Sequence, residues 1–124
     1  MTVYFDTKTG NVRRFIEKLI LIDPSINAID INDMVDMDQL SEMGHLVTYT
    51  TGSGNVPVTT AYFMERHHNN ILTVSCSGNR NWGRNFALCA VILSAQFDKP
   101  IGHRFELSGL DNDIAFFLES IHSY

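Results

Sequence analysis

The sequence contains no long hydrophobic run, and acidic residues outnumber basic ones. Its longest uninterrupted apolar stretch, residues 86–93, is far shorter than the roughly 18 residues that a membrane-spanning helix requires. Nine Lys and Arg against 14 Asp and Glu give a formal net charge of -5, whereas a general nucleic-acid binder carries a basic face. Neither a membrane nor a nucleic acid is therefore an expected partner.

Cysteines are also scarce. Cys76 and Cys89 are too few and too widely spaced for a zinc or thioredoxin motif. Asp6 and Lys8 interrupt any apolar core that an N-terminal signal peptide would need. We therefore expect a reduced, cytoplasmic protein without a metal site, in which Cys89 is a small core residue of a helix.

Short β-rich runs alternate with helical patterns along the 124 residues, which predicts one α/β domain spanning residues 1–124. Its parallel sheet should carry helices on both faces, giving three layers. The expected strands cover residues 3–5, 28–31, 45–50, 71–76 and 101–105. The expected helices cover residues 12–19, 57–68, 84–97 and 114–121, with capping-box spacing from Ser108 before the last. Residues 33–43 are expected to form an acidic surface loop with one helical turn.

The turn after the first expected strand has the features of an anion-binding site. Two threonine hydroxyls and Lys8 crowd this turn, and Gly10 can adopt backbone angles that other residues avoid. The following helix begins with N–H groups that have no partner within the helix and that attract negative charge. An ordinary turn with Thr9 or Asn11 as the N-cap is the alternative interpretation.

Two further loops, residues 50–57 and 77–83, also follow expected strands and are rich in glycine and polar residues. In open doubly wound sheets, ligands bind outside the carboxyl ends of the strands, where the strand order reverses. A flavodoxin-like strand order of 2-1-3-4-5 puts that reversal between the first and third strands. We therefore expect the three loops to face one crevice.

The composition of the loops favours a particular ligand. The first loop has neither the glycine spacing of a dinucleotide turn nor the Gly-Lys-Ser/Thr ending of a nucleoside-triphosphate loop. A monophosphate fits better, because Thr7, Thr9 and backbone N–H groups can satisfy its oxygens. Glycines in the other loops let the backbone approach a flat ring, against whose face Tyr49 or Trp82 could lie. Flavin mononucleotide (FMN) meets both demands.

Four motifs give the chain a resemblance to the NrdI family, the flavodoxin-like proteins that serve class Ib ribonucleotide reductase. The motifs occupy residues 3–15, 48–57, 77–83 and 105–109 and together span nearly the whole chain in the family's order. The combination of Ser-Gly-Asn-Arg-Asn-aromatic-Gly with Phe-Glu-Leu-Ser-Gly is specific, whereas residues 20–44 match least.

The resemblance implies bound FMN and a partner. In the family's scheme, reduced flavin converts dioxygen to superoxide, which passes to the dimanganese centre of the small reductase subunit and assembles its tyrosyl radical. A reductase that the sequence does not identify supplies the electrons. No side chain is expected to be catalytic, and the chain is interpreted as a redox-active accessory flavoprotein. The candidate cofactor-binding residues are Asp6, Thr7, Lys8, Thr9, Gly10, Asn11, Val12, Tyr49, Thr50, Thr51, Gly52, Ser53, Gly54, Asn55, Ser77, Gly78, Asn79, Asn81, Trp82 and Gly83.

Other functions were weighed against this interpretation. A stand-alone electron-transfer flavodoxin shares the fold and the cofactor and is the main alternative. A phospho-acceptor signalling module needs an aspartate at the end of the third strand, where this chain has Thr50 and Thr51. A hydrolase needs a nucleophile with a paired base, and Ser53 lacks the Gly-x-Ser-x-Gly context.

The charges of the loops also suggest how the flavin is tuned. Residues 50–57 include no acid and the third loop carries Arg80, whereas electron-transfer flavodoxins usually surround the ring with acidic loops. Because fully reduced flavin tends to become anionic, nearby positive charge favours its two-electron reduction. We further expect the loop from Gly52 to Gly54 to turn a carbonyl towards the flavin N5 position when a proton arrives there.

Overall fold

The computed structural model describes residues 1–34, 39–52 and 54–124. Five strands form one sheet in the order β2-β1-β3-β4-β5, and each neighbouring pair is parallel. The predicted strand order is therefore confirmed, including its reversal between β1 and β3. The strands are β1 (Thr2–Phe5), β2 (Asn27–Asp30), β3 (Gly44–Tyr49), β4 (Ile71–Gly78) and β5 (Ile101–Glu106).

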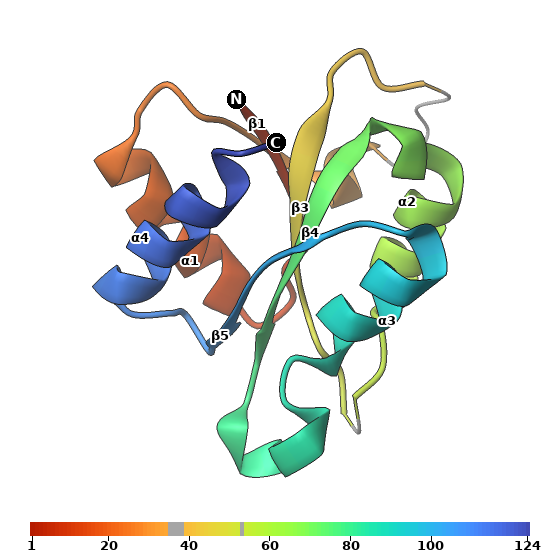
Figure 1. Ribbon diagram of the computed structural model, residues 1–124, viewed down its shortest axis with the longest axis vertical. Coiled ribbons are helices and arrows are strands. Elements are labelled where there is room, and N and C mark those ends of the chain that lie inside the picture. Colours follow the sequence, from red (N-terminus) through yellow and green to blue (C-terminus); the bar gives the residue numbers. More distant parts are fainter. Residues whose placement is uncertain (35–38, 53) are drawn as a thin grey trace.

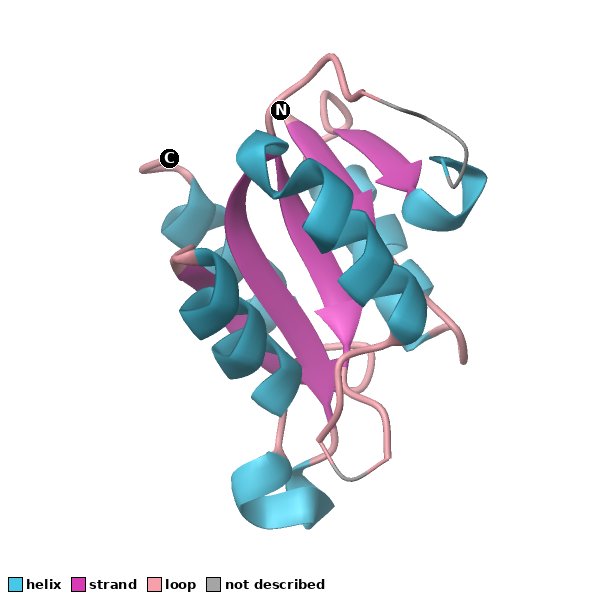
Figure 2. Ribbon diagram, turned by 90° about the vertical axis from the view of Figure 1, so that its right-hand side faces the viewer, coloured by secondary structure: helices cyan, strands magenta, loops and turns pink. Residues whose placement is uncertain are grey.

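Helices cover both faces of this sheet, so the predicted three layers are confirmed. The helices α1 (Asn11–Ile22) and α4 (Asp111–Ile121) lie on one face, and α2 (Val58–His67) and α3 (Leu88–Phe97) lie on the other (Figure 1). Figure 2 shows the twisted sheet between the two helical layers. No helix in the described part of the chain is both long and apolar enough to cross a membrane. Three short 3-10 helices complete the elements, namely η1 (Ile31–Met34), η2 (His68–Asn70) and η3 (Arg80–Asn85).

Each face of the sheet has its own hydrophobic core. Under α1 and α4, the ring of Phe15 stacks on Phe105 with centroids 4.1 Å apart and meets Phe117 edge-on. Under α2 and α3, the core includes Leu46, Val74, Leu93 and both cysteines. Cys89 is fully buried, which confirms its expected place in the core.

The third helix begins later than predicted. Residues 84–97 were expected to be helical, but α3 starts only at Leu88. Gly83 and Ala87 both have positive φ angles, 58° and 48°, which a right-handed helix does not allow. A Cβ atom built on Gly78 would lie 2.4 Å from the Ala87 backbone nitrogen, so this segment packs directly against the end of β4. This close contact with β4 holds residues 83–87 out of an α-helical conformation, so α3 begins later than the apolar pattern predicts.

The cap of the last helix also differs from the prediction. Leu110, not Ser108, is the N-cap residue of α4, and the Asp113 carboxylate accepts a hydrogen bond from the Leu110 N–H at 2.7 Å. The Ser108 hydroxyl instead donates to the Asn11 Oδ1 at 3.0 Å and accepts from the Arg14 Nε at 2.9 Å. Ser108 therefore ties the β5–α4 loop to the start of α1.

The remaining boundaries shift by one to three residues. The strands β2 and β3 each begin and end one residue before the predicted ranges, and β4 extends two residues further, through Ser77 and Gly78. Pro57 lies immediately before α2, at its N-cap position. In the acidic stretch 33–43, the expected helical turn is η1, which begins at Ile31, while residues 35–38 lie outside the described residues.

Candidate functional site

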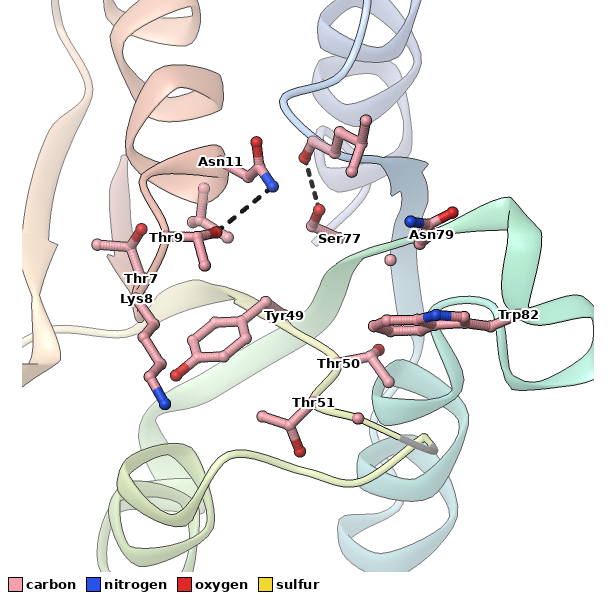
Figure 3. Close-up of a pocket in the computed structure, with 14 residues that line it drawn as sticks. Thr7, Lys8, Thr9, Asn11, Tyr49, Thr50, Thr51, Ser77, Asn79 and Trp82 are labelled. Atoms are coloured by element: carbon pink, nitrogen blue, oxygen red, sulfur yellow. Dashed lines mark hydrogen bonds between the residues drawn. The ribbon is translucent and has the colours of Figure 1, made fainter.

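The loops that follow β1, β3 and β4 come together at one end of the sheet (Figure 1). Between them lies a pocket of about 360 Å³ (Figure 3). The expected crevice between the three loops is thus present. Its lining residues are Thr7, Lys8, Thr9, Asn11, Val12, Tyr49, Thr50, Thr51, Gly52, Ser77, Gly78, Asn79, Trp82 and Leu107.

The turn between β1 and α1 leaves the first N–H groups of the helix uncapped. Gly10 is the N-cap residue, with φ 94°, and among the described residues no side-chain hydrogen bond caps the helix. The alternative with Thr9 or Asn11 as the N-cap is therefore wrong. Asn11 Nδ2 instead donates to Thr9 Oγ1 at 3.5 Å, and both residues line the pocket (Figure 3). Uncapped N–H groups at a helix start favour an anion.

The Thr7 hydroxyl gives an independent indication of a ligand. Its Oγ1 is buried and has no hydrogen-bond partner among the described residues. Buried polar atoms in folded proteins almost always have a partner. Thr7 lines the pocket beside Lys8, where a phosphate oxygen would accept from the hydroxyl and meet a positive charge. The turn therefore fits the phosphate of FMN.

Two aromatic side chains flank the rest of the pocket. Tyr49 lies on the side of the Thr7–Asn11 turn and Trp82 on the opposite side, with Thr50 and Thr51 between them (Figure 3). Burial, and less strongly the negative charge of Asp6, raises the pKa of the Tyr49 hydroxyl, so it stays neutral. Tyr49 and Trp82 thus offer a flat ring two apolar surfaces.

Leu107 lines the pocket but was missed by the sequence analysis. Its carbonyl accepts a hydrogen bond from the Ser77 hydroxyl at 2.5 Å, and its N–H donates to the Gly78 carbonyl at 2.9 Å. Its φ of 53° places it in the left-handed region, which is uncommon for leucine. The Phe-Glu-Leu-Ser-Gly motif was the available signal, because it follows β5 at the same edge of the sheet.

Asp6 lies behind the pocket lining. It is 2% exposed, and its carboxylate accepts hydrogen bonds from Thr60 Oγ1 at 2.7 Å and Asn32 Nδ2 at 3.1 Å. Burial raises the pKa of this carboxyl, and the two hydrogen bonds oppose the shift. Asp6 thus anchors the phosphate turn to α2 and η1.

Other candidate residues flank the lining without belonging to it. Ser53 lies outside the described residues. Gly54 is buried, with a φ of 107°, and a Cβ atom there would lie 3.0 Å from the Leu88 side chain. The candidates absent from the lining are Asp6, Gly10, Gly54, Asn55, Asn81 and Gly83.

The positively charged side chain expected near the ring, that of Arg80, lies outside this pocket. Arg80 places its guanidinium over the Phe86 ring, 4.4 Å from the centroid, and lines a neighbouring cavity rather than this pocket. Its backbone N–H donates to Glu106 Oε2 at 3.0 Å. Lys8 is the charged residue among those that line the pocket, and no Asp or Glu is among them. The described residues contain no cluster of three or more His, Cys, Asp or Glu that could hold a metal ion.

Comparison with known families agrees with the fold and with the motifs. Residues 3–119 match the family model described as "NrdI Flavodoxin like". A protein named NrdI from Bacillus licheniformis is 42% identical over 119 residues, which cover 96% of this chain and 86% of that protein.

Solved structures show the same architecture at low sequence identity. Oxidised flavodoxin 1 from Bacillus cereus superposes with a TM-score of 0.70 at 19% identity, covering 99% of this chain and 97% of that one. A flavodoxin from Fusobacterium nucleatum, solved with bound flavin mononucleotide, gives a TM-score of 0.59 at 12% identity, with 98% and 94% covered. These likenesses concern the fold alone.

Proposed function

The chain belongs to the NrdI flavodoxin-like family, and on that premise we propose that it binds FMN and activates a class Ib ribonucleotide reductase in the cytoplasm. When bound, reduced FMN would supply the electrons that convert dioxygen to superoxide for the dimanganese centre of the small reductase subunit. An electron-donating reductase would restore the reduced cofactor. The chain acts as an accessory flavoprotein of that partner.

The unpartnered Thr7 hydroxyl is the observation that best supports a bound phosphate. We assign Thr7, Lys8, Thr9 and the first N–H groups of α1 to the phosphate of FMN. Thr7 and Thr9 would donate hydrogen bonds, and Lys8 would supply charge without requiring a fixed geometry. This turn anchors the cofactor at the end of the pocket that β1 provides.

The two other loops are assigned to the flavin ring. Tyr49 and Trp82 would pack against the ring and exclude water from it, while the backbone of residues 50–52 and 77–79 would hydrogen-bond to its edge. Gly52 has a φ of 41°, and apart from its chain neighbours no atom of the described residues lies within 4 Å of a Cβ built on it, so the backbone there has room to turn. When a proton is bound at the flavin N5 position, a carbonyl of this loop would turn towards it and accept a hydrogen bond from the N5–H group.

A stand-alone electron-transfer flavodoxin remains the second candidate, because it shares the fold and the cofactor. The absence of Asp and Glu from the described residues of the pocket lining favours the activator role, since electron-transfer flavodoxins surround the ring with acids. The two candidates differ in their reaction with dioxygen and in their partner.

Titration of the apoprotein with FMN tests the cofactor assignment. We expect one equivalent to bind, with quenching of flavin fluorescence as the ring enters the pocket between Tyr49 and Trp82. Binding of riboflavin should be much weaker, because riboflavin lacks the phosphate that the β1–α1 turn is built to hold. Equal affinity for the two flavins would contradict the role given to this turn.

A further inference from the structure

A pair of cysteine thiols lies directly beneath the pocket. Cys76 belongs to β4 and Cys89 to the first turn of α3, and both side chains lie in the same hydrophobic core, where the two thiols interact. Both are free thiols with an exposed fraction of 0%. Neither cysteine is assigned to the binding of FMN.

Thr50 connects this pair to the pocket. Its side chain lines the pocket, and its Oγ1 lies 3.0 Å from the Cys76 Sγ. The same oxygen accepts a hydrogen bond from the Cys89 backbone N–H at 3.4 Å. Thr50 therefore links the pocket to the Cys76 thiol and to the backbone of Cys89.

The surroundings make the two thiols unequal. Cys76 pairs in register with Arg104 of β5, whose positive charge favours a thiolate. Burial acts to raise the pKa of Cys76, but hydrogen bonds from Cys89, Thr50 and the Ala90 backbone together with Arg104 bring it below its ordinary value. The interaction with Cys76, with burial, raises the pKa of Cys89. Cys76 is thus the better nucleophile, because the thiolate is the reactive form.

We propose that Cys76 and Cys89 form a redox-active pair that closes to an intramolecular disulfide when hydrogen peroxide reaches it through the pocket. The source of that oxidant in the cell rests on the proposed function, because reduction of dioxygen at the flavin yields superoxide and, by dismutation, hydrogen peroxide. The reaction of the thiols with peroxide does not depend on that function.

The chemistry needs no other reactant. The Cys76 thiolate attacks one peroxide oxygen, the O–O bond breaks, and the departing hydroxide takes a proton to become water, which leaves a sulfenic acid on Cys76. The Cys89 sulfur then attacks the Cys76 sulfur, the S–S bond forms, and the S–O bond breaks to release a second water. In sum, two thiols lose two electrons and two protons, and one peroxide is reduced to two waters.

The crosslink would act on the pocket itself. Residues 77–88 lie between the two cysteines, and this segment supplies Ser77, Gly78, Asn79 and Trp82 to the pocket lining. A disulfide would join the two ends of the segment and restrict its movement. Oxidation of the pair would therefore restrict the movement of the loop that is assigned to the flavin ring, in response to the peroxide that the flavin generates.

Thiol counting by mass spectrometry tests the proposal in two samples. The apoprotein is treated with hydrogen peroxide, and the holoprotein is photoreduced and then exposed to dioxygen with catalase in the bulk solution. Both are denatured, alkylated and weighed intact. We expect both samples to lose both alkylation sites together with two hydrogens in mass. If both thiols of the peroxide-treated apoprotein stay fully alkylatable, the proposal is wrong.

Comparison of the two samples separates this proposal from the proposed function. A crosslink in the apoprotein without one in the reduced holoprotein would support the thiol pair but contradict the flavin as its source of oxidant. Single variants test the order of the steps. In Cys89→Ser, dimedone should label Cys76, whereas in Cys76→Ser labelling of Cys89 should be at least about tenfold slower. Equal labelling in the two variants would contradict Cys76 as the attacking thiol.

Discussion

At the residue scale, Thr7 links the sequence most directly to the cofactor. Its buried hydroxyl lacks a partner among the described residues, and such a group destabilises a folded protein unless a ligand satisfies it. Its place between an expected strand and an expected helix already marked this residue as a candidate in the sequence. The structure adds that Thr7 lines the pocket.

Thr7→Val should therefore separate binding from stability. Removal of one hydrogen bond to a charged phosphate should weaken FMN binding by about 10- to 100-fold. The apoprotein should be at least as stable as the wild type, because valine keeps the shape and removes an unpartnered hydroxyl. Isothermal titration and urea unfolding would measure the two quantities.

Thr59→Val is the matched control for this prediction, since Thr59 is half-buried at the start of α2 and lies outside the lining of the FMN pocket. It should leave FMN affinity unchanged. Unaltered affinity in Thr7→Val itself would contradict the phosphate assignment.

His45 makes the stability of the fold depend on pH. It is 2% exposed on β3, and its Nδ1 lies 2.8 Å from the Thr73 hydroxyl. Burial, and less strongly the positive N-terminal amine, lower the pKa of His45 to about 4. The unfolded chain, with a histidine pKa of about 6.5, binds the proton more readily, so this contribution to stability is lost as the pH falls from about 6.5 to about 4.

We expect urea unfolding to show a loss on the order of 2 kcal/mol from His45 across this pH window. The raised pKa of Asp6 acts in the opposite sense, because it adds stability at low pH that is lost as the carboxyl ionises. Comparison with His45→Gln isolates the histidine. If wild type and variant show the same dependence between pH 4 and 6.5, His45 is not the cause.

At the scale of elements, the three loops after β1, β3 and β4 have different proposed roles in binding FMN. The β1–α1 turn is assigned to the phosphate, and the two other loops to the ring. Lys8 is the charged residue of the pocket lining, while Arg80 lies over Phe86 in a neighbouring cavity. The positive charge near the ring is therefore smaller than the sequence suggested, but the lining still includes no acid.

Asn79→Asp tests this charge balance with little change in shape. The Asn79 Oδ1 accepts a hydrogen bond from the Asn81 N–H at 2.9 Å, and a carboxylate can accept it equally. The added negative charge at the pocket should make two-electron reduction harder, lowering its midpoint potential by tens of millivolts, on the order of 10–40 mV.

Potentiometry of the bound flavin would measure this shift, with Asn69→Asp as the control. Asn69 is exposed in η2, just before β4 begins, whereas the pocket lies where β4 ends. The control should leave the potential unchanged. A potential that rises in Asn79→Asp, or that shifts equally in both variants, would contradict the electrostatic account.

The elements themselves were predicted well where local pattern decides them. Apolar residues at helical spacing located α1, and β-rich runs located the strands, because these patterns follow from which side chains must be buried. The start of α3 could not be predicted in this way. It depends on the contact between Gly78 and Ala87, which only the folded chain brings together.

The site shows the same limit. The predicted turn and loops supply 13 of the 14 lining residues, since the carboxyl ends of parallel strands necessarily meet at one edge. Leu107 was missed because its role depends on its backbone contacts with Ser77 and Gly78. Asp6 was expected at the cofactor, but Thr60 and Asn32 hold its carboxylate behind the lining.

At the scale of the whole molecule, the fold positions the proposed FMN pocket at one end of the sheet. The strand order β2-β1-β3-β4-β5 brings together loops that lie up to about 75 residues apart in sequence, and helices on both faces keep them in place. The loops that line the pocket thus lie at one end of the sheet, while the opposite end holds the chain termini (Figure 1).

Activation of a partner subunit tests the central claim most directly. The FMN-loaded protein would be reduced, mixed with a manganese-loaded small subunit of a class Ib ribonucleotide reductase, and exposed to dioxygen, with tyrosyl radical followed by electron paramagnetic resonance. We predict that radical forms with the reduced holoprotein and not with the apoprotein or with free reduced FMN. Radical yields no greater than those with free reduced FMN would contradict the activator role and leave the electron-transfer flavodoxin as the better description.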